Sequence, residues 1–100
     1  MPQEPFELLE SVCDEESFLR FLFALAADRE ASTAKEAVQQ SSPYGTDANG
    51  WENTTIDRFL FAAIEWARAS ANGLPLAGYK PPSNPWRRCA DILHAGKGYE

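Results

Sequence analysis

The residues best suited to chemistry in this 100-residue chain are few and far apart. His94 is the single histidine, and no cysteine stands at metal-ligand spacing from it, so the sequence predicts no metal site. No phosphate-binding glycine loop and no nucleophile-elbow motif is present. Two carboxylate pairs are conceivable, Glu52 with Asp57 and Glu65 with Asp91, but acidic residues fall near one another by chance in an acidic protein. We therefore expect a protein that is not an enzyme and uses no cofactor.

The cysteines, Cys13 and Cys89, lie near opposite ends of the chain and form no C-x-x-C motif. In a reducing compartment both are expected to be free. Cys89 falls among apolar residues, so we expect it to be buried. A bridge between the two stays open, because sequence alone does not place the sulfurs.

Charge is distributed unevenly along the chain. The net charge is −6, and residues 1–40 hold nine acidic and three basic side chains, whereas residues 41–100 hold six of each. An acidic half repels a phosphate backbone, so we expect no nucleic acid partner and favour a basic protein. No apolar run is long enough to span a bilayer, and the acidic start MPQEPFELLE lacks the pattern of a secretory signal. The expectation is a cytoplasmic protein without a membrane partner.

Helices are the elements that would position these residues. FELLESV, residues 6–12, suits a short helix. Ser11 or Asp14 can cap a second helix over residues 15–37. Its apolar residues recur at helical spacing, namely Phe18, Phe21, Leu22 and Leu25.

A middle helix is predicted over residues 55–71 because its apolar residues share one face: Ile56, Phe59, Leu60, Ala63, Ile64, Ala67 and Ala71. Asn53 or Thr54 would then be its N-cap, with Trp51 folded back on the first turn. A last helix over residues 85–95 opens with Asn84 as cap and Pro85 at the first helical position. Its expected buried stripe is Trp86, Cys89, Ala90 and Leu93.

Proline and glycine mark the connections. Residues 41–50 and residues 74–83 read as two long ordered loops, and Asn72-Gly73 supplies a helix stop between them. No period-two run of β-branched residues appears. The predicted fold class is all-α, a compact bundle of three main helices with a short N-terminal helix, in a single domain of residues 1–100.

Some large apolar residues lie away from the predicted core faces of this bundle. Leu19 and Phe23 form a second apolar strip on their helix, and Phe61 points away from the core face of the middle helix. Such a cluster is a candidate surface for self-association, with coverage by the long loops as the alternative.

Arg87-Arg88 lies in the first turn of the last helix, against the dipole, which hints at an acidic partner. We favour an intramolecular partner, for instance Glu52, over an external ligand.

Two stretches of the chain resemble motifs of a known family. WENTT and the carboxyl-terminal WRRCADILHAGKGYE are similar to W-E-N-x-T and W-x-x-x-A-x-x-L-x-A-G-K-x-Y-E, shared by a family of small bacterial domains of unknown function. The resemblance covers most of residues 14–100. It implies a compact helical domain and supplies no catalytic residue.

The residues around these motifs are the best candidates for a binding surface: Trp51, Glu52, Asn53, Trp86, Arg87, Lys97 and Tyr99. The same residues could be architecture, with Trp51 packed on Trp86 and Glu52 paired with Arg87. The leading hypothesis is a non-enzymatic module that binds and masks a basic protein, as immunity and inhibitor proteins do. The alternative is a homodimer with Leu19, Phe23 and Phe61 at the seam, and a third hypothesis is an enzyme using scattered carboxylates.

Overall fold

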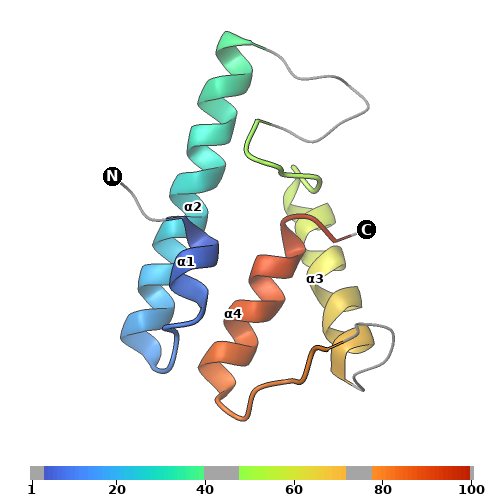
Figure 1. The fold of residues 1–100 in the computed structure, drawn as a ribbon. Coiled ribbons are helices and arrows are strands. Elements are labelled where there is room, and N and C mark those ends of the chain that lie inside the picture. The colour runs from blue at the N-terminus through green and yellow to red at the C-terminus, as the bar shows by residue number, and fades with distance from the viewer. Residues whose placement is uncertain (1–3, 40–47, 72–77, 100) are drawn as a thin grey trace.

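The structure is a computed structural model that describes residues 4–39, 48–71 and 78–99. Within these ranges the chain forms four helices and no strand: α1 (Pro5–Leu9), α2 (Glu15–Val38), α3 (Ile56–Ala71) and α4 (Pro85–Gly96). Helix α4 packs against both α2 and α3, and α1 packs against α2 and α4 (Figure 1). The all-α prediction is confirmed, and each main helix begins and ends within one residue of its expected bound.

Local capping explains why two of these helices start where they do. The carboxylate of Asp14 accepts a 2.8 Å hydrogen bond from the Ser17 N–H, and the Ser17 hydroxyl accepts one of 3.1 Å from the Asp14 N–H. This reciprocal capping box opens α2. In α4, the Asn84 side chain accepts from the N–H groups of Trp86 and Arg87, with Pro85 at the first position. Both predicted starts are confirmed.

The predicted cap of the middle helix is wrong. Helix α3 begins at Ile56, and the hydroxyl of Thr55 lies 3.4 Å from the Arg58 N–H that it caps. A hydrogen bond from Thr55 and a further one from the Arg58 backbone lower the pKa of Asp57. Asn53 does not cap this helix because its amide is bound to the end of α4, as described below.

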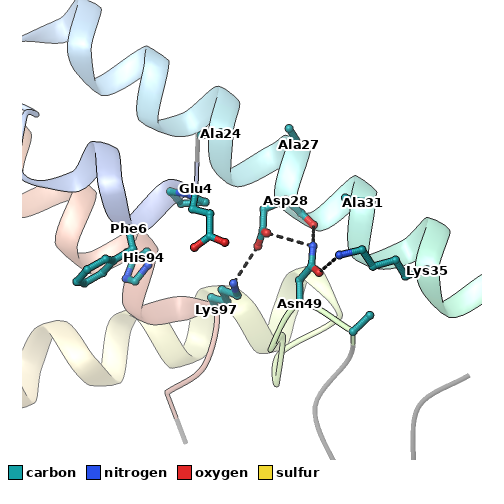
Figure 2. A pocket seen from close by; sticks show the side chains of 12 residues that line it. Glu4, Phe6, Ala24, Ala27, Asp28, Ala31, Lys35, Asn49, His94 and Lys97 are labelled. Atoms are coloured by element: carbon teal, nitrogen blue, oxygen red, sulfur yellow. Dashed lines mark hydrogen bonds and ion pairs between the residues drawn. The ribbon is translucent and has the colours of Figure 1, made fainter. Parts of the chain in front are cut away.

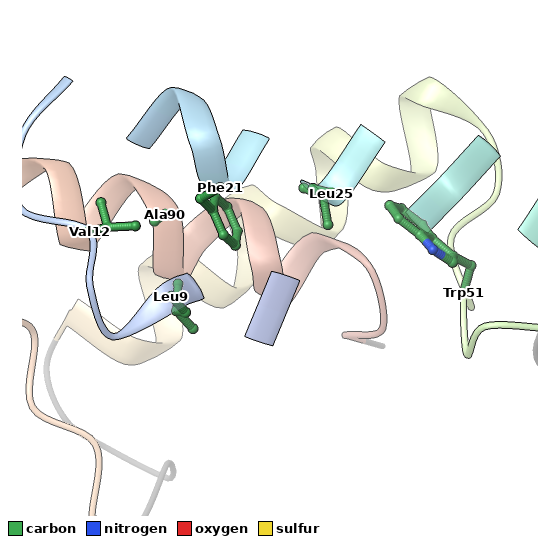
Figure 3. Packing of buried hydrophobic residues seen from close by; sticks show 6 residues of the cluster. All are labelled: Leu9, Val12, Phe21, Leu25, Trp51 and Ala90. Carbon is green, nitrogen blue, oxygen red and sulfur yellow. The ribbon is translucent and has the colours of Figure 1, made fainter. Parts of the chain in front are cut away.

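The core lies where α1, α2 and α4 meet (Figure 3). Phe21 is completely buried at its centre, and Ala90 of α4 is buried beside it. The other buried members of the cluster are Leu9, Val12, Leu25 and Trp51. Half-buried side chains complete it: Phe18, Leu22, Phe59, Trp86 and Leu93. Burial of this apolar surface is the main force that holds the helices together.

Helix α3 buries only part of its expected apolar face. Ile56, Leu60 and Ile64 are 81%, 49% and 45% exposed. The fully buried residues of α3 are the small Ala62, Ala63 and Ser70. Among the described helices α3 contacts α4 alone, so one narrow stripe is covered and the rest of the apolar face remains open.

Helix α4 is packed on two sides. Ala90 faces the core, whereas the Gly96 Cα lies so close to α3 that an added Cβ would meet the Phe59 ring and carbonyl at 3.0 Å. Cys89 lies between these two sides and is exposed, so the prediction that it is buried is wrong. Asp91 is buried instead.

The two predicted loops are described only in part. Residues 48–50 and 78–83 carry no helix or strand, in agreement with the expectation. The remainder of both loops, the predicted helix stop at Asn72-Gly73 and the last residue, Glu100, lie outside the described residues.

Candidate functional site

Trp51 is an internal anchor. Its indole N–H donates a 2.8 Å hydrogen bond to Oδ2 of Asp28 on α2, and its ring packs against Phe59 with centroids 6.0 Å apart. The cationic groups of Arg29 and Lys97 lie 5.5 and 5.6 Å from the ring centroid. Trp51 is only 5% exposed, so it positions its neighbours and offers no surface of its own.

Glu52 and Asn53 bind the carboxyl-terminal end of α4. Their backbone N–H groups donate to the Lys97 carbonyl at 3.1 and 3.2 Å. The Asn53 amide donates to the carbonyls of Gly96 and Tyr99 at 2.9 and 3.0 Å. These carbonyls have no partner within the helix, so the W-E-N motif acts as a C-terminal cap for α4.

The predicted binding residues do not form one surface. Trp86 and Arg87 lie in the first turn of α4, while Lys97 follows its last residue, about 15 Å away along the axis. Trp86 packs on Phe18 with centroids 5.5 Å apart, and Arg87 pairs with Asp91 at 2.9 Å. The expected contacts of Trp86 with Trp51 and of Arg87 with Glu52 are replaced by these.

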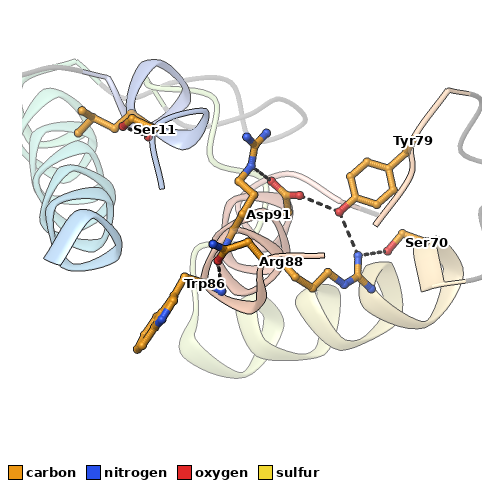
Figure 4. Close-up of polar contacts among 9 residues, drawn as sticks. Ser11, Ser70, Tyr79, Trp86, Arg88 and Asp91 are labelled. Atoms are coloured by element: carbon orange, nitrogen blue, oxygen red, sulfur yellow. Dashed lines mark hydrogen bonds and ion pairs between the residues drawn. The ribbon is translucent and has the colours of Figure 1, made fainter. Parts of the chain in front are cut away.

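The acidic partner of the arginine pair is therefore internal, as favoured, but it is a different residue (Figure 4). Asp91 accepts from Arg87 at 2.9 Å and from the Tyr79 hydroxyl at 2.7 Å. Arg88 donates to the Ser70 hydroxyl at 2.8 Å, to Tyr79 at 3.2 Å and to the Ala67 carbonyl at 2.8 Å. Burial and the bond to Asp91 raise the pKa of Tyr79. This network ties the end of α3 and residues 78–80 to α4.

Asp28 is the central residue of a second network, which sequence reasoning missed (Figure 2). Its carboxylate accepts from Trp51, from Lys97 at 2.9 Å and from the Asn49 amide at 3.1 Å. Asn49 in turn accepts a 2.7 Å hydrogen bond from Lys35. Of the predicted candidates, Trp51 and Lys97 are thus brought together by a residue that was not among them.

A cavity of about 590 Å³ adjoins this network. It lies between α1, α2, residues 48–49 and the end of α4, and we call it the Asp28 pocket. Its lining combines small apolar and charged residues: Glu4, Pro5, Phe6, Ala24, Ala27, Asp28, Ala31, Lys35, Ala48, Asn49, His94 and Lys97. The signal in the sequence was available, because Ala24, Ala27 and Ala31 follow helical spacing on the side of α2 that also carries Asp28.

His94 stands at the wall of this pocket. Its ring lies 6.0 Å from Phe6 and 6.2 Å from Phe21, centroid to centroid. Burial is the main cause that lowers the pKa of His94, and the charge of Lys97 lowers it further, against the opposing charges of Asp91 and Asp28. The imidazole is therefore neutral at pH 7.

A second, apolar hollow of about 420 Å³ lies on the other side of α2. It is a groove between α2 and α3, lined by Leu22, Leu25, Ala26, Arg29, Trp51, Asn53, Thr54, Thr55, Ile56, Phe59, Leu60 and Leu93. Large apolar residues continue outward from both walls. Leu19, Phe23 and Phe61 are 54%, 76% and 66% exposed. We call the following set of exposed side chains, together with the half-buried Leu22, the apolar surface: Leu19, Leu22, Phe23 and Ala26 of α2 with Ile56, Leu60, Phe61 and Ile64 of α3.

Other kinds of site are not seen in the part of the chain that the structure describes. No group of three metal-binding side chains occurs in residues 4–39, 48–71 and 78–99. Cys13 and Cys89 are both free and exposed. None of the described helices combines the length and apolar character that crossing a bilayer requires.

The four helices define a small all-α domain. A family model described as "Family of unknown function (DUF7660)" matches residues 14–100, and the chain belongs to this family. No curated protein and no solved structure matches the chain. Helix α1 precedes the matched residues, although it packs against α2 and α4.

Proposed function

We propose that this chain is a non-enzymatic protein-binding module that docks its partner on the apolar surface. The observation that carries the proposal is the uncovered face of α3 opposite an equally apolar edge of α2, with a groove between them. A partner helix that lays an apolar ridge into such a groove is a common mode of protein recognition.

The size of the apolar surface supports this function. Large apolar side chains bury on the order of 150 Å² each, so six of them at half to four-fifths exposure offer about 500 Å². Monomeric proteins rarely expose contiguous apolar patches of more than a few hundred Å². Together with the atoms around it, this area approaches the ~800 Å² that each partner contributes to a stable interface.

Charge at the edge of the apolar surface indicates the kind of partner. Glu15 and Glu16 lie one turn before Leu19, and Glu30 lies one turn after Ala26, all exposed on the same helix. Glu10 and Asp14 add exposed carboxylates just before the first turn of α2. A basic protein with an apolar ridge complements this arrangement, and electrostatic attraction would speed its association. Masking of such a partner, in the manner of immunity or inhibitor proteins, is the specific form of the proposal.

Self-association is the second candidate, because Phe23 and Phe61 project beyond the groove and would reach a second copy. In a two-fold dimer the same surface meets itself, so the acidic edges of two chains, each with a net charge of −6, would approach one another. This repulsion favours a basic partner over a second copy.

The proposal is tested by capture from the native lysate at low salt with four tagged proteins: wild type, Phe23→Glu, Phe61→Glu and Val38→Glu. Val38 is an exposed apolar residue at the end of α2, outside the apolar surface, and serves as the matched control. We expect wild type and Val38→Glu to retain one basic protein that is released as salt rises, and the two phenylalanine variants to lose it. Equal recovery by all four, or recovery of nothing, would overturn the proposal.

Light scattering on the purified proteins separates the second candidate from the first. A wild-type dimer that becomes a folded monomer in Phe61→Glu would assign the apolar surface to self-association. A monomeric wild type removes that alternative.

A further inference from the structure

The Asp28 pocket lies on the opposite side of α2 from the apolar surface and is a separate feature of the molecule. It is open because Ala24, Ala27 and Ala31 present only methyl groups along three successive turns of α2. At about 590 Å³ it is within the size range of small-molecule sites in proteins. An inference from this pocket does not depend on the proposed function.

The polar wall of the pocket is held in place by several contacts. The Ala48 N–H donates to Glu36 at 2.9 Å, and the Asn49 N–H donates to the buried Ser32 hydroxyl at 3.3 Å. The Asn49 amide donates to both the carbonyl and the carboxylate of Asp28. Residues 48 and 49 are therefore held against α2 by four hydrogen bonds.

Hydrogen-bonding capacity remains on two sides of the pocket. Lys97 and Lys35 each have three N–H donors and use one of them for Asp28 and Asn49 respectively. The carboxylate of Asp28 already accepts three hydrogen bonds. Glu4 faces the Asp28–Lys97 pair in Figure 2. Its backbone carbonyl accepts from the Glu7 N–H, but its carboxylate makes no hydrogen bond or ion pair with any described residue. The pocket thus offers spare cationic donors beside one spare carboxylate.

The remaining lining is apolar. Pro5 and Phe6 of α1 line the pocket together with the three alanines of α2, and the ring of His94 lies 6.0 Å from that of Phe6. A ligand that fits needs an anionic group for the lysines, a cationic group for Glu4 and a compact apolar body. We propose that the Asp28 pocket binds a small zwitterion, an α-amino acid with an apolar or aromatic side chain.

The first test is a titration of the isotope-labelled full chain, followed by NMR chemical shifts, with L-phenylalanine as probe. We expect saturable shifts at Asn49, His94 and Lys97 with a Kd of about 1 mM or tighter, which a ligand of this size can reach. Phenylpropionate lacks the amine and phenethylamine lacks the carboxylate. Each compound should bind about tenfold more weakly than L-phenylalanine, because it loses one charge-assisted hydrogen bond. No saturable shift with L-phenylalanine, or equal affinity for all three compounds, would overturn the proposal.

Variants assign each half of the zwitterion to its partner. Glu4→Gln should weaken L-phenylalanine about tenfold and leave phenylpropionate unchanged, whereas Lys35→Gln should weaken both. Glu65→Gln and Lys80→Gln remove the same charges at exposed positions outside the pocket and are the matched controls. A loss of affinity in the controls equal to that in Glu4→Gln and Lys35→Gln would show a general charge effect and overturn the assignment.

A third variant tests the cavity itself. Ala31→Leu adds three carbons into the pocket, whereas Ala34→Leu adds them to an exposed position of α2 outside it. We expect binding to be lost in Ala31→Leu and kept in Ala34→Leu, with both proteins folded by circular dichroism. Binding that survives in Ala31→Leu would place the probe elsewhere.

Discussion

The two long sides of α2 differ in polarity and in how much of each side is covered by the rest of the chain. On one side the Asp28 carboxylate accepts hydrogen bonds from Asn49, Trp51 and Lys97, so it holds two distant segments, residues 49–51 and the end of α4. On the other side Leu19 and Phe23 remain more than half exposed. The first side is closed by polar contacts around a cavity, and the second is apolar and uncovered.

The difference indicates which side contributes to the stability of the free protein. Removing a member of a buried polar network leaves its partners unsatisfied, which costs stability. Removing an exposed apolar side chain changes the stability of the free protein little. Residues on the polar side should therefore be needed for folding, whereas residues on the apolar side should be needed only when a partner is present.

The largest effect is expected from Asp28→Ala. The substitution leaves the Trp51 indole N–H, the Lys97 ammonium and the Asn49 amide without their shared acceptor, at a cost of about 3 kcal/mol in the free energy of unfolding. Phe23→Ala on the opposite side should change that free energy by no more than ~0.5 kcal/mol. Urea denaturation followed by circular dichroism measures both, and similar values for the two variants would remove the distinction between the sides.

The sequence predicted the helices well because their signals are local. Capping residues, proline at a first turn and apolar spacing lie within a few positions of the ends that they set, so bounds within one residue could be predicted. Only the start of α3 misled us, since Asn53 has the right residue type for a cap but is used by α4.

Burial and the site depend on distant contacts and were harder to predict. An apolar stripe predicts which face of a helix can be buried, and the number of neighbouring helices determines how much of that face is buried. Among the described helices α3 has one neighbour, so Ile56 and Leu60 remain exposed, while α4 has neighbours on two sides and leaves Cys89 between them. Asp28 was missed because its three partners come from elsewhere in the chain, and no spacing rule connects them.

An intermediate effect is expected from the W-E-N motif. Asn53→Ala removes two hydrogen bonds to carbonyls at the end of α4 and should lower the free energy of unfolding by about 2 kcal/mol. Thr55→Ala removes the long, exposed cap of α3 and should cost about 0.5 kcal/mol. Chemical denaturation measures the free energy of unfolding of both variants. A larger loss of this free energy in Thr55→Ala would mean that the motif mainly stabilises the start of α3.

The smallest effect is a pH dependence on the polar side, and it arises from His94. Its pKa is lowered in the folded protein, so between the ordinary value of 6.5 and the lower folded value the unfolded chain binds more protons than the folded one. The contribution of His94 to the free energy of unfolding is therefore fully present above about pH 6.5, and it is lost as the pH falls toward the folded pKa. The charges that act on the ring are Lys97, Asp91 and Asp28, and the Glu4 carboxylate lines the same pocket.

Denaturant midpoints measured between pH 7.5 and about pH 5 should therefore decline in the wild type and decline less in His94→Gln, which cannot titrate in this range. The exposed carboxylates of Asp14 and Asp57 have pKa values lowered from 3.8, so their contribution is lost only at more acidic pH and does not overlap with this window. A control on the opposite side, Phe61→Gln, should keep the wild-type pH dependence, because Phe61 does not contact the ring. If the His94→Gln and wild-type curves ran parallel, the imidazole would be as well solvated in the folded protein as in the unfolded chain. The His94 side of the Asp28 pocket would then be open to water, and the apolar half of the proposed zwitterion site would lose its basis.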